Sequence, residues 1–211
     1  MNNTIAPNTS KIQYAIFDVG QVIYPFTLNP LKELLQTKTY ALEEYQNNAN
    51  PLHYNYNPYM KGEQTTEEFI KDLCLFCHVE YTPSIADSIN QALHQGCGER
   101  FTETKEAITF LRQHKITICL LSNALPILSD TGKGIAKPEH TFTSYKLGLL
   151  KPNYRIYEAV KNTLNVPYTH LLFIDDKSKN VTAAQELGIN GIIFNRATIL
   201  ADIKSILLFK E

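Results

Sequence analysis

The hydrophobic positions of this chain follow a helical spacing in the first half and alternate between strand-like runs and helical segments in the second half. Residues 14–17 (YAIF) and 171–174 (LLFI) form two continuous apolar runs of strand length. Such runs are typical of parallel strands that are buried on both faces. The first run ends on Asp18 and the second on Asp175 and Asp176. The pattern predicts a buried parallel sheet with acidic groups at the carboxyl ends of two strands.

The segment after the first strand has helical periodicity. Its first apolar residues at this spacing are Leu31, Leu34, Leu35, Ala41, Leu42 and Tyr45. A break follows at 47–51 (NNANP). Thr65 and Glu68 fit a capping box at a helix start, and a helix over 83–93 is closed by 96–98 (GCG). The segment therefore predicts a helical insertion after the first strand.

From about residue 100 onward, strands are expected to alternate with helices. The expected strands are 116–121, 141–145, 171–174 and 191–194, and the expected helices are 102–114, 154–164, 179–187 and 199–209. Alternation of this kind builds a parallel sheet through right-handed crossovers, with helices on both faces. The predicted fold class is α/β, with a three-layer, Rossmann-like core.

Composition narrows the class of protein. The chain has 211 residues, of which 44% are hydrophobic, enough for one domain with a sizeable insertion or two small domains. The formal net charge of −1 argues against nucleic acid or an anionic membrane as the main partner. No apolar stretch is long enough to span a bilayer, and residues 1–10 lack the features of a secretory signal. We expect a cytoplasmic protein, monomeric or homodimeric.

Residues 74–78 (CLFCH) match the pattern of covalent haem attachment. The same residues continue a helical pattern in which Phe69, Leu73 and Phe76 share one stripe. A cytoplasmic chain also keeps its thiols reduced. We therefore interpret these two cysteines as small core residues.

Polar groups stand where strands end or where loops lead into helices of the predicted core. They are Asp18, Ser122, Asn123, Lys151, Asp175 and Asp176. Each has a structural explanation alone, as a turn residue, a helix cap or a solvated loop lysine. These separate explanations leave the shared placement of the groups unaccounted for. In open α/β sheets, ligands bind beyond the carboxyl ends of the strands, which favours a common site.

The chemistry of these groups fits phosphoryl transfer. Asp18 can attack phosphorus and form an aspartyl-phosphate. Asp175 and Asp176 can hold Mg²⁺, which binds through one or two carboxylates and substrate phosphate. A cation such as Lys151 stabilises the negative charge that develops on the phosphoryl group. The residues predicted to bind the phosphoryl group are Ser122, Asn123 and Lys151.

The order of these motifs resembles the haloacid dehalogenase-like (HAD) hydrolase superfamily, from residue 13 to the end. The matching runs are YAIFD (14–18), LSNA (121–124), GLLKP (148–152), KPNYRIY (151–157), FIDD (173–176) and NVTAAQELG (180–188). The branch with a helical cap is the most similar, including bacterial sugar-phosphate phosphatases and the N-terminal phosphatase domain of soluble epoxide hydrolases. The resemblance implies a cytosolic, Mg²⁺-dependent phosphatase that acts on a small phosphorylated metabolite.

The resemblance also implies a domain division. Residues 59–69 resemble part of the helical cap of this branch. The core would comprise residues 11–24 and 100–211, and the cap residues 25–99. Residues 1–10 would be a flexible lead-in.

The sequence departs from the family pattern at Gly20. Family phosphatases usually carry a second aspartate there, which donates a proton to the leaving group and later activates water. General acid–base catalysis contributes about 10²–10⁴-fold. Gly20 still offers a backbone carbonyl to Mg²⁺, as the family does at this position. Tyr24 is a possible substitute acid, but a packing role suits it better because its ordinary pKa is about 10.

Three functions are compatible with these residues. The first is a Mg²⁺-dependent phosphomonoesterase. The second is a phosphate-binding or regulatory protein with little turnover, which the glycine at position 20 motivates. The third is a dehalogenase, which shares the aspartate nucleophile but gives Asp175 and Asp176 no metal to bind. Candidate substrate contacts are Tyr24, His53, Tyr54, Tyr56, Tyr59 and Lys61. The tyrosine cluster fits a surface that stacks on a sugar or base and the core of the cap equally well.

Overall fold

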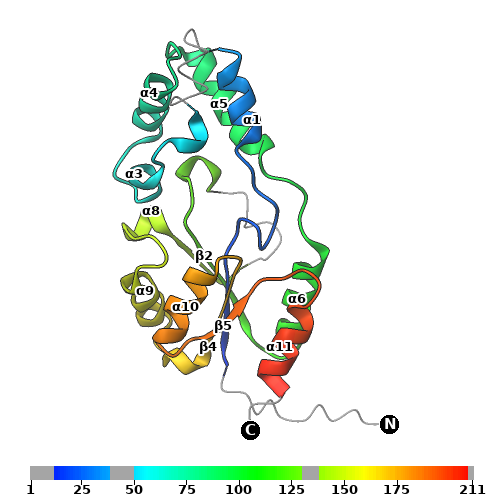
Figure 1. Ribbon diagram of the computed structural model, residues 1–211. Helices are drawn as coiled ribbons and strands as arrows, with labels where there is room; N and C mark the ends of the chain where they lie inside the picture. The colour runs from blue at the N-terminus through cyan, green and yellow to red at the C-terminus, as the bar shows by residue number, and fades with distance from the viewer. Residues whose placement is uncertain (1–11, 39–49, 130–137, 209–211) are drawn as a thin grey trace.

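The computed structural model describes residues 12–38, 50–129 and 138–208. Its centre is a parallel sheet in the order β3-β2-β1-β4-β5 (Figure 1). The strands are β1 (Tyr14–Phe17), β2 (Thr117–Ser122), β3 (His140–Thr143), β4 (Leu171–Asp175) and β5 (Asn190–Ile193). Phe17 in β1 pairs with Leu120 in β2 and with Ile174 in β4. The two strands that end in carboxylates are therefore neighbours.

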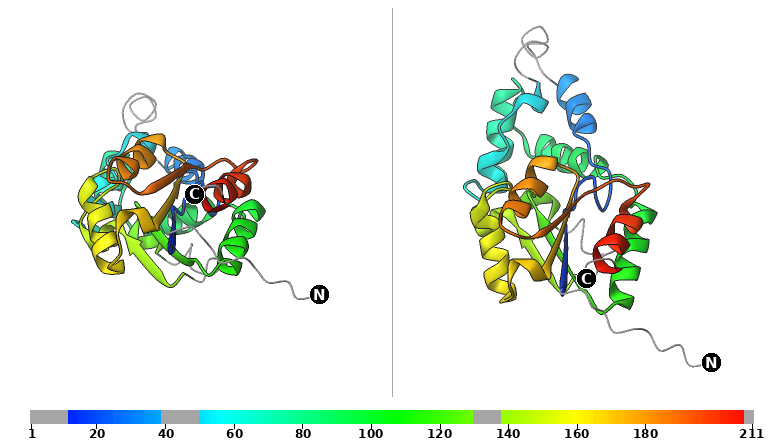
Figure 2. Two further views of the ribbon diagram at one scale, coloured as in Figure 1. Left: turned by 90° about the horizontal axis from the view of Figure 1, so that it is seen from below. Right: turned by 60° about the horizontal axis from the view of Figure 1, so that its bottom comes forward.

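Helices cover both faces of the sheet, as Figure 2 shows. Successive side chains of a strand point to opposite faces. Ala15 and Phe17 pack in the apolar cluster that includes α6 (Thr102–Gln113) and α11 (Ile199–Leu208). Ile16 packs in the opposite cluster, with α9 (Tyr154–Leu164) and α10 (Ser178–Glu186). The predicted three-layer α/β core is confirmed.

One predicted strand is wrong at its end. The strand expected over 141–145 runs from His140 to Thr143, and Ser144 begins the short helix α8 (Ser144–Leu147). Gly148 closes that helix in a left-handed conformation, with φ of 66°, which glycine adopts without steric cost. The other core elements lie within one or two residues of their predicted bounds, except that Phe209 lies outside the described residues.

The segment between β1 and α6 is helical, as predicted, and lies beyond the carboxyl ends of the strands (Figure 1). Its elements are α1 (Asn29–Gln36), the 3₁₀ turn η1 (Pro51–His53), α3 (Asn57–Met60), α4 (Thr66–Phe76) and α5 (Pro83–Gln95). We call these elements the helical insertion. They share an apolar cluster, which includes Leu31, Leu35, Tyr59, Phe69 and Leu93 and which Leu125 and Leu128 join from the segment after β2. The predicted helical residues Ala41, Leu42 and Tyr45, and 47–49 of the predicted break, lie outside the described residues.

Local sequence signals explain where the helices of the insertion begin. Thr65 Oγ1 accepts a hydrogen bond from the Glu68 backbone N–H, and Glu68 Oε2 accepts one from the Thr65 N–H. This confirms the predicted capping box of α4. Helix α5 starts with Pro83 in its first turn, and Gly96 caps its end.

Cys74 and Cys77 lie in the apolar cluster of the insertion, where the helical periodicity puts them. Both are free thiols and are at most 1% exposed. Burial raises the pKa of Cys74 to about 11 and that of Cys77 to about 12. Two thiols in this environment behave as small apolar residues. Among the described helices, none has the length and apolarity to cross a membrane.

Candidate active site

A cavity of about 1020 Å³ lies between the carboxyl ends of the strands and the helical insertion. Asp18 and Gly20 line it after β1, and Ser122 lines it at the end of β2. Asp176 lines it after β4, and Lys151 lines it from the loop before α9. Position beyond the carboxyl ends of parallel strands is where α/β sheets bind ligands.

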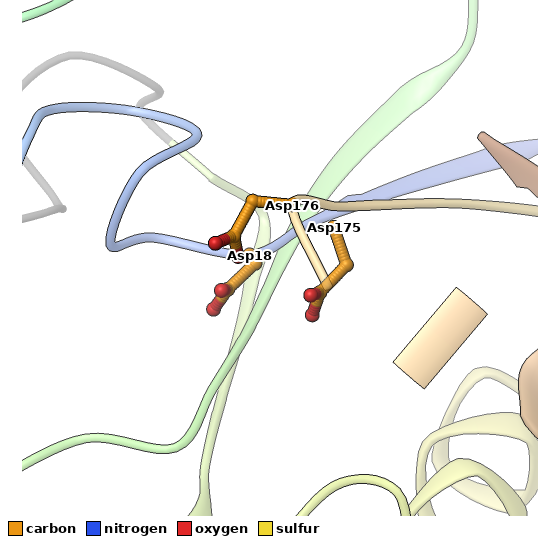
Figure 3. Close-up of side chains that lie close together, drawn as sticks. All are labelled: Asp18, Asp175 and Asp176. Carbon is orange, nitrogen blue, oxygen red and sulfur yellow. The ribbon is translucent and has the colours of Figure 1, made fainter. Parts of the chain in front are cut away.

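Three carboxylates meet at the strand ends beneath this cavity, and those of Asp18 and Asp176 line it. Asp18, Asp175 and Asp176 each offer an oxygen, and these oxygens lie within 4.8 Å of one another. Figure 3 shows the carboxylates of Asp18 and Asp176 next to each other at the strand ends. Close carboxylates repel, so a cation beside them lowers the energy of the ionised forms. Oxygen donors of this kind suit a hard divalent ion.

Lys151 supplies one positive charge to this group. Its Nζ lies 2.9 Å from Asp18 Oδ1 and 2.6 Å from Asp175 Oδ2, and it donates to the Leu121 carbonyl at 2.8 Å. Burial disfavours the ammonium form, but the two carboxylates outweigh this and raise the pKa of Lys151. The Lys151 side chain is 1% exposed, so it is held as a fixed cation in a site of low dielectric.

The pKa of Asp18 is raised above its usual value, mainly because the side chain is buried. Lys151 opposes this shift, and the nearby charge of Asp175 adds to it. The pKa of Asp176 is raised by partial burial, then by the charges of Asp18 and Asp175. When all three carboxylates are ionised, they carry more negative charge than Lys151 alone compensates.

Asp175 and Asp176 have different surroundings. Asp175 is fully buried, and both of its oxygens accept hydrogen bonds. Oδ1 accepts from the Lys177 N–H and the Asn180 amide at 2.9 Å each, and Oδ2 accepts from the Asn180 amide at 3.0 Å and from Lys151 at 2.6 Å. Asp176 Oδ1, in contrast, is buried and has no hydrogen-bond partner. An orphaned buried oxygen calls for an ion or water, so Asp176 is the better metal donor of the two.

Gly20 leaves open space in the cavity wall. A Cβ built there would meet only the Phe26 Cβ within 4 Å, at an ordinary contact distance of 3.8 Å. The backbone of Gly20 also lies outside the left-handed region that favours glycine. Neither space nor backbone conformation requires glycine at this position.

The family follows from a match over most of the sequence. Residues 12–188 match the sequence profile of the haloacid dehalogenase-like hydrolase family. The chain belongs to this family. Together with the parallel sheet and its carboxylate cluster, the match confirms the predicted family resemblance.

Solved structures of HAD proteins have the same fold. An enzyme of Bacteroides thetaiotaomicron, in complex with magnesium and inorganic phosphate, is 23% identical over 88% of this chain and 95% of that chain, with a TM-score of 0.71. A predicted HAD-like hydrolase of Porphyromonas gingivalis is 22% identical over 96% and 100%, with a TM-score of 0.74. The L-2-haloacid dehalogenase of Xanthobacter autotrophicus is 15% identical over 85% and 76%, with a TM-score of 0.58. At these identities, the likeness shows the fold and not the activity.

Two predicted phosphate-binding residues of this HAD site have different environments. Ser122 is 8% exposed at the end of β2 and faces the cavity. The Asn123 amide donates to the Lys151 carbonyl at 3.0 Å and accepts from the Lys151 N–H at 2.9 Å. Asn123 therefore fixes the backbone that carries Lys151. A direct contact of Asn123 with substrate stays a prediction.

Sequence reasoning missed two polar residues of the HAD site. Asn180 is 3% exposed and donates to Asp175, and its backbone carbonyl accepts from the Tyr157 hydroxyl at 2.8 Å. Its signal was a polar residue in the first turn of a helix that follows a strand. Thr143 lines the cavity at the end of β3, and its hydroxyl is buried without a partner. The incorrect strand end at 141–145 obscured it.

The insertion contributes part of the cavity wall. Of the six residues predicted as cap contacts, Tyr24, Tyr56 and Lys61 line the cavity. His53, Tyr54 and Tyr59 are not among the lining residues. Tyr59 is fully buried and stacks on Phe69 with 4.1 Å between ring centroids. It therefore belongs to the core of the insertion.

Proposed function

We propose that this chain is a Mg²⁺-dependent phosphomonoesterase that acts on a small phosphorylated metabolite and forms an aspartyl-phosphate on Asp18. One observation carries the proposal: the buried Asp18, paired with Lys151, lies beside the carboxylate of Asp176, which has an orphaned oxygen. The magnesium and phosphate found with HAD enzymes of similar fold support it.

The donor set suits Mg²⁺. Asp18, Asp176 and the backbone carbonyl of Gly20 would hold the ion, and the orphaned Asp176 oxygen supports this choice. When bound, Mg²⁺ neutralises charge on the phosphoryl oxygens and on the carboxylates beside them. Asp175 would not bind the ion directly, because its oxygens already accept hydrogen bonds from Lys151 and Asn180 and orient them.

Phosphoryl transfer is catalysed mainly by positioning and electrostatics. Asp18 attacks phosphorus in line with the leaving oxygen, and Lys151 stabilises charge on the transferring group. The Ser122 hydroxyl donates to a phosphoryl oxygen. Asn123 holds the Lys151 backbone, and Asp175 holds the Lys151 ammonium group.

We assign residues 25–99 as a cap over a core of residues 11–24 and 100–211. The cavity between the insertion and the strand ends supports this division. A cap that closes over the substrate excludes water and strengthens electrostatic interactions in the site. The four free cysteines fit the reducing cytoplasm, which we propose as the location.

The test is hydrolysis of p-nitrophenyl phosphate and of a panel of phosphorylated metabolites. We expect turnover with Mg²⁺, its loss in EDTA, and a loss of at least about 10³-fold in Asp18→Asn, because the nucleophile is removed. Asp87→Asn is the matched control, since Asp87 is exposed on α5 outside the cavity. Activity that survives Asp18→Asn, or that does not need a divalent ion, would contradict the proposal.

A phosphate-binding protein with little turnover is the second candidate, and Gly20 favours it. In that case beryllofluoride with Mg²⁺ would raise the melting temperature while no ester is hydrolysed. Steady-state release of phosphate excludes this candidate. Chloride release from a 2-haloacid would instead support a dehalogenase, the activity named for one protein of similar fold.

A further inference from the structure

We infer that the substrates are phosphate esters whose leaving oxygen departs as an anion, with phenolic esters as the class that fits best. This inference rests on the proposed phosphatase function and specifies its substrate class. It is argued from the polar side chains that line the cavity and from the apolar lining residues that pack in the cluster of the insertion.

The described part of the cavity wall offers few proton donors. Asp18 and Asp176 are the only residues among those described there that carry a carboxyl group, and none of those described is histidine or cysteine. Asp18 is the nucleophile in the proposed reaction, and Asp176 is a proposed ligand of the metal ion. Gly20, which is close to the nucleophile in sequence, has no side chain. The described wall therefore lacks the groups that most often protonate a leaving oxygen.

The two phenols of the wall have partners elsewhere. Tyr24 is 5% exposed and hydrogen-bonds to the thiol of Cys97. Tyr56 donates to the Pro51 carbonyl at 2.8 Å. Both hydroxyls thus already have a hydrogen-bond partner within the protein.

Besides Lys151, which is held by Asp18 and Asp175, three lysines line the described part of the wall. Lys61 Nζ lies 3.0 Å from Glu63, and Lys177 and Lys179 are exposed. Lys61 is thus paired with a carboxylate, and the roles of the two exposed lysines are tested by the substitutions Lys177→Met and Lys179→Met.

Without a proton donor, the leaving oxygen must depart as an anion. A bond forms between an Asp18 oxygen and phosphorus, while the bond from phosphorus to the ester oxygen breaks and leaves its electron pair on that oxygen. The departing anion takes a proton from solvent afterwards. Water then cleaves the aspartyl-phosphate, which restores Asp18 and releases inorganic phosphate and a proton. A phenol, with a pKa near 10, departs as an anion far more readily than a simple alcohol.

Part of the cavity lining suits an aromatic leaving group. Six described lining residues belong to, or pack against, the apolar cluster of the insertion: Phe26, Leu28, Tyr56, Met60, Leu125 and Leu128. Aromatic rings pack favourably against aromatic side chains and against methionine sulfur. The volume of about 1020 Å³ leaves room for a ring beside the phosphoryl group. The acidity of the leaving alcohol and the lining of the cavity therefore favour the same class, the phenolic esters.

The experiment measures kcat/KM for a series of phenyl phosphates of rising leaving-group pKa, together with glycerol phosphate and a sugar 6-phosphate. In the wild type, kcat/KM should fall steeply with leaving-group pKa, and phenyl phosphate should exceed the alkyl esters by at least about 10²-fold. The parameter kcat/KM is the right one because breakdown of a shared aspartyl-phosphate would make kcat alike for all good leaving groups.

Gly20→Asp supplies a carboxyl group where the cavity has space for it. It should raise kcat/KM for the alkyl esters by about 10–10³-fold and flatten the dependence on leaving-group pKa. Gly20→Asn is the matched control, since it adds the same bulk without an acidic proton, and it should keep the steep dependence. Circular dichroism and melting curves check that both variants are folded.

Several outcomes would overturn the inference. Alkyl esters hydrolysed as fast as phenyl phosphate in the wild type would do so. Equal effects of Gly20→Asp and Gly20→Asn would also contradict it. A steeper dependence in Lys177→Met or Lys179→Met would identify that lysine as a proton donor. If even p-nitrophenyl phosphate is not hydrolysed with Mg²⁺, it is the proposed function itself that fails.

Discussion

Asp175 and Asp176 are adjacent in the chain but have opposite hydrogen-bonding environments. Asp175 is the last residue of β4, and its oxygens are saturated by Lys151, Asn180 and a backbone N–H. Asp176 faces the cavity with an orphaned oxygen. Successive side chains of an extended chain point to opposite sides. One residue therefore positions the lysine, while the next remains available to a cation.

We predict that the Thr143 hydroxyl, which is buried without a hydrogen-bond partner, binds the substrate phosphate. Its hydroxyl is buried and unpartnered, so replacing it with a methyl group in Thr143→Val should leave the free energy of unfolding unchanged or slightly higher. Loss of a hydrogen bond to a charged phosphoryl group should raise KM for phosphate esters about tenfold. Thr143→Ser keeps the hydroxyl and should behave as wild type.

Thr104→Val is the matched control and should show the opposite pattern. The Thr104 hydroxyl is buried and donates to the Val22 carbonyl, away from the cavity lining. Its loss should lower the free energy of unfolding by about 1–3 kcal/mol and leave KM unchanged. Urea denaturation and steady-state kinetics on the three variants separate the two effects. An unchanged KM in Thr143→Val would remove Thr143 from the substrate site.

Helix α4 of the insertion depends on its capping box. Thr65→Ala should lower the free energy of unfolding by about 1 kcal/mol, because the Glu68 N–H loses its acceptor. Thr65→Ser keeps the acceptor and should be close to wild type, as urea denaturation would show. Equal stability of the alanine and wild-type proteins would mean that the cap contributes nothing.

The stability that this capping box contributes should depend on pH through the carboxyl group of Glu68. Hydrogen bonds from Thr65, first from its backbone N–H and then from its side chain, lower the pKa of Glu68 below its ordinary value. A lowered folded-state pKa means that the stabilisation is present above the unfolded pKa and is lost as pH falls through the folded value. An NMR titration should find the Glu68 pKa below that of an unstructured glutamate, and closer to it in Thr65→Ala.

The elements that sequence alone predicts best are those specified by local patterns. Strand β1 was predicted with its observed bounds because a continuous apolar run of four residues precedes a carboxylate. The start of α4 was predicted because a capping box is a local motif. Strand β3 was predicted too long, because its polar edge residues gave no clear end and Ser144 enters a helix that packs beneath the insertion.

Sequence alone predicted those site residues that stand at the ends of apolar runs or in the loops that follow them. Asp18, Ser122 and Asp176 follow apolar runs, and Lys151 was predicted from its place in the loop before a core helix. The division of roles between the two adjacent aspartates was not predictable, because it depends on which oxygen faces Lys151 and Asn180 in three dimensions. The contacts of Asn123 with the Lys151 backbone, 28 residues away in sequence, were hidden for the same reason.

At the scale of the whole molecule, the carboxylate cluster links metal binding to stability. Mg²⁺ at about 100 times its Kd should stabilise the fold by about 2.7 kcal/mol, because it binds only the folded state. For a chain of this size, that corresponds to a rise in Tm of about 5–10 °C. The measurement is thermal denaturation in EDTA and at rising Mg²⁺ concentrations, with Asp87→Asn as a control that should keep the full rise.

The two adjacent aspartates should respond differently in that experiment. Folding raises the pKa of Asp176, so its ionised form opposes folding at neutral pH. Asp176→Asn should therefore melt slightly higher than wild type in EDTA and lose most of the rise with Mg²⁺. Asp175→Asn should melt lower in both conditions, because it weakens the buried contacts with Lys151 and Asn180, and it should keep part of the rise. If Asp175→Asn abolishes the rise while Asp176→Asn keeps it, the roles that the hydrogen bonds assign to these two residues are reversed.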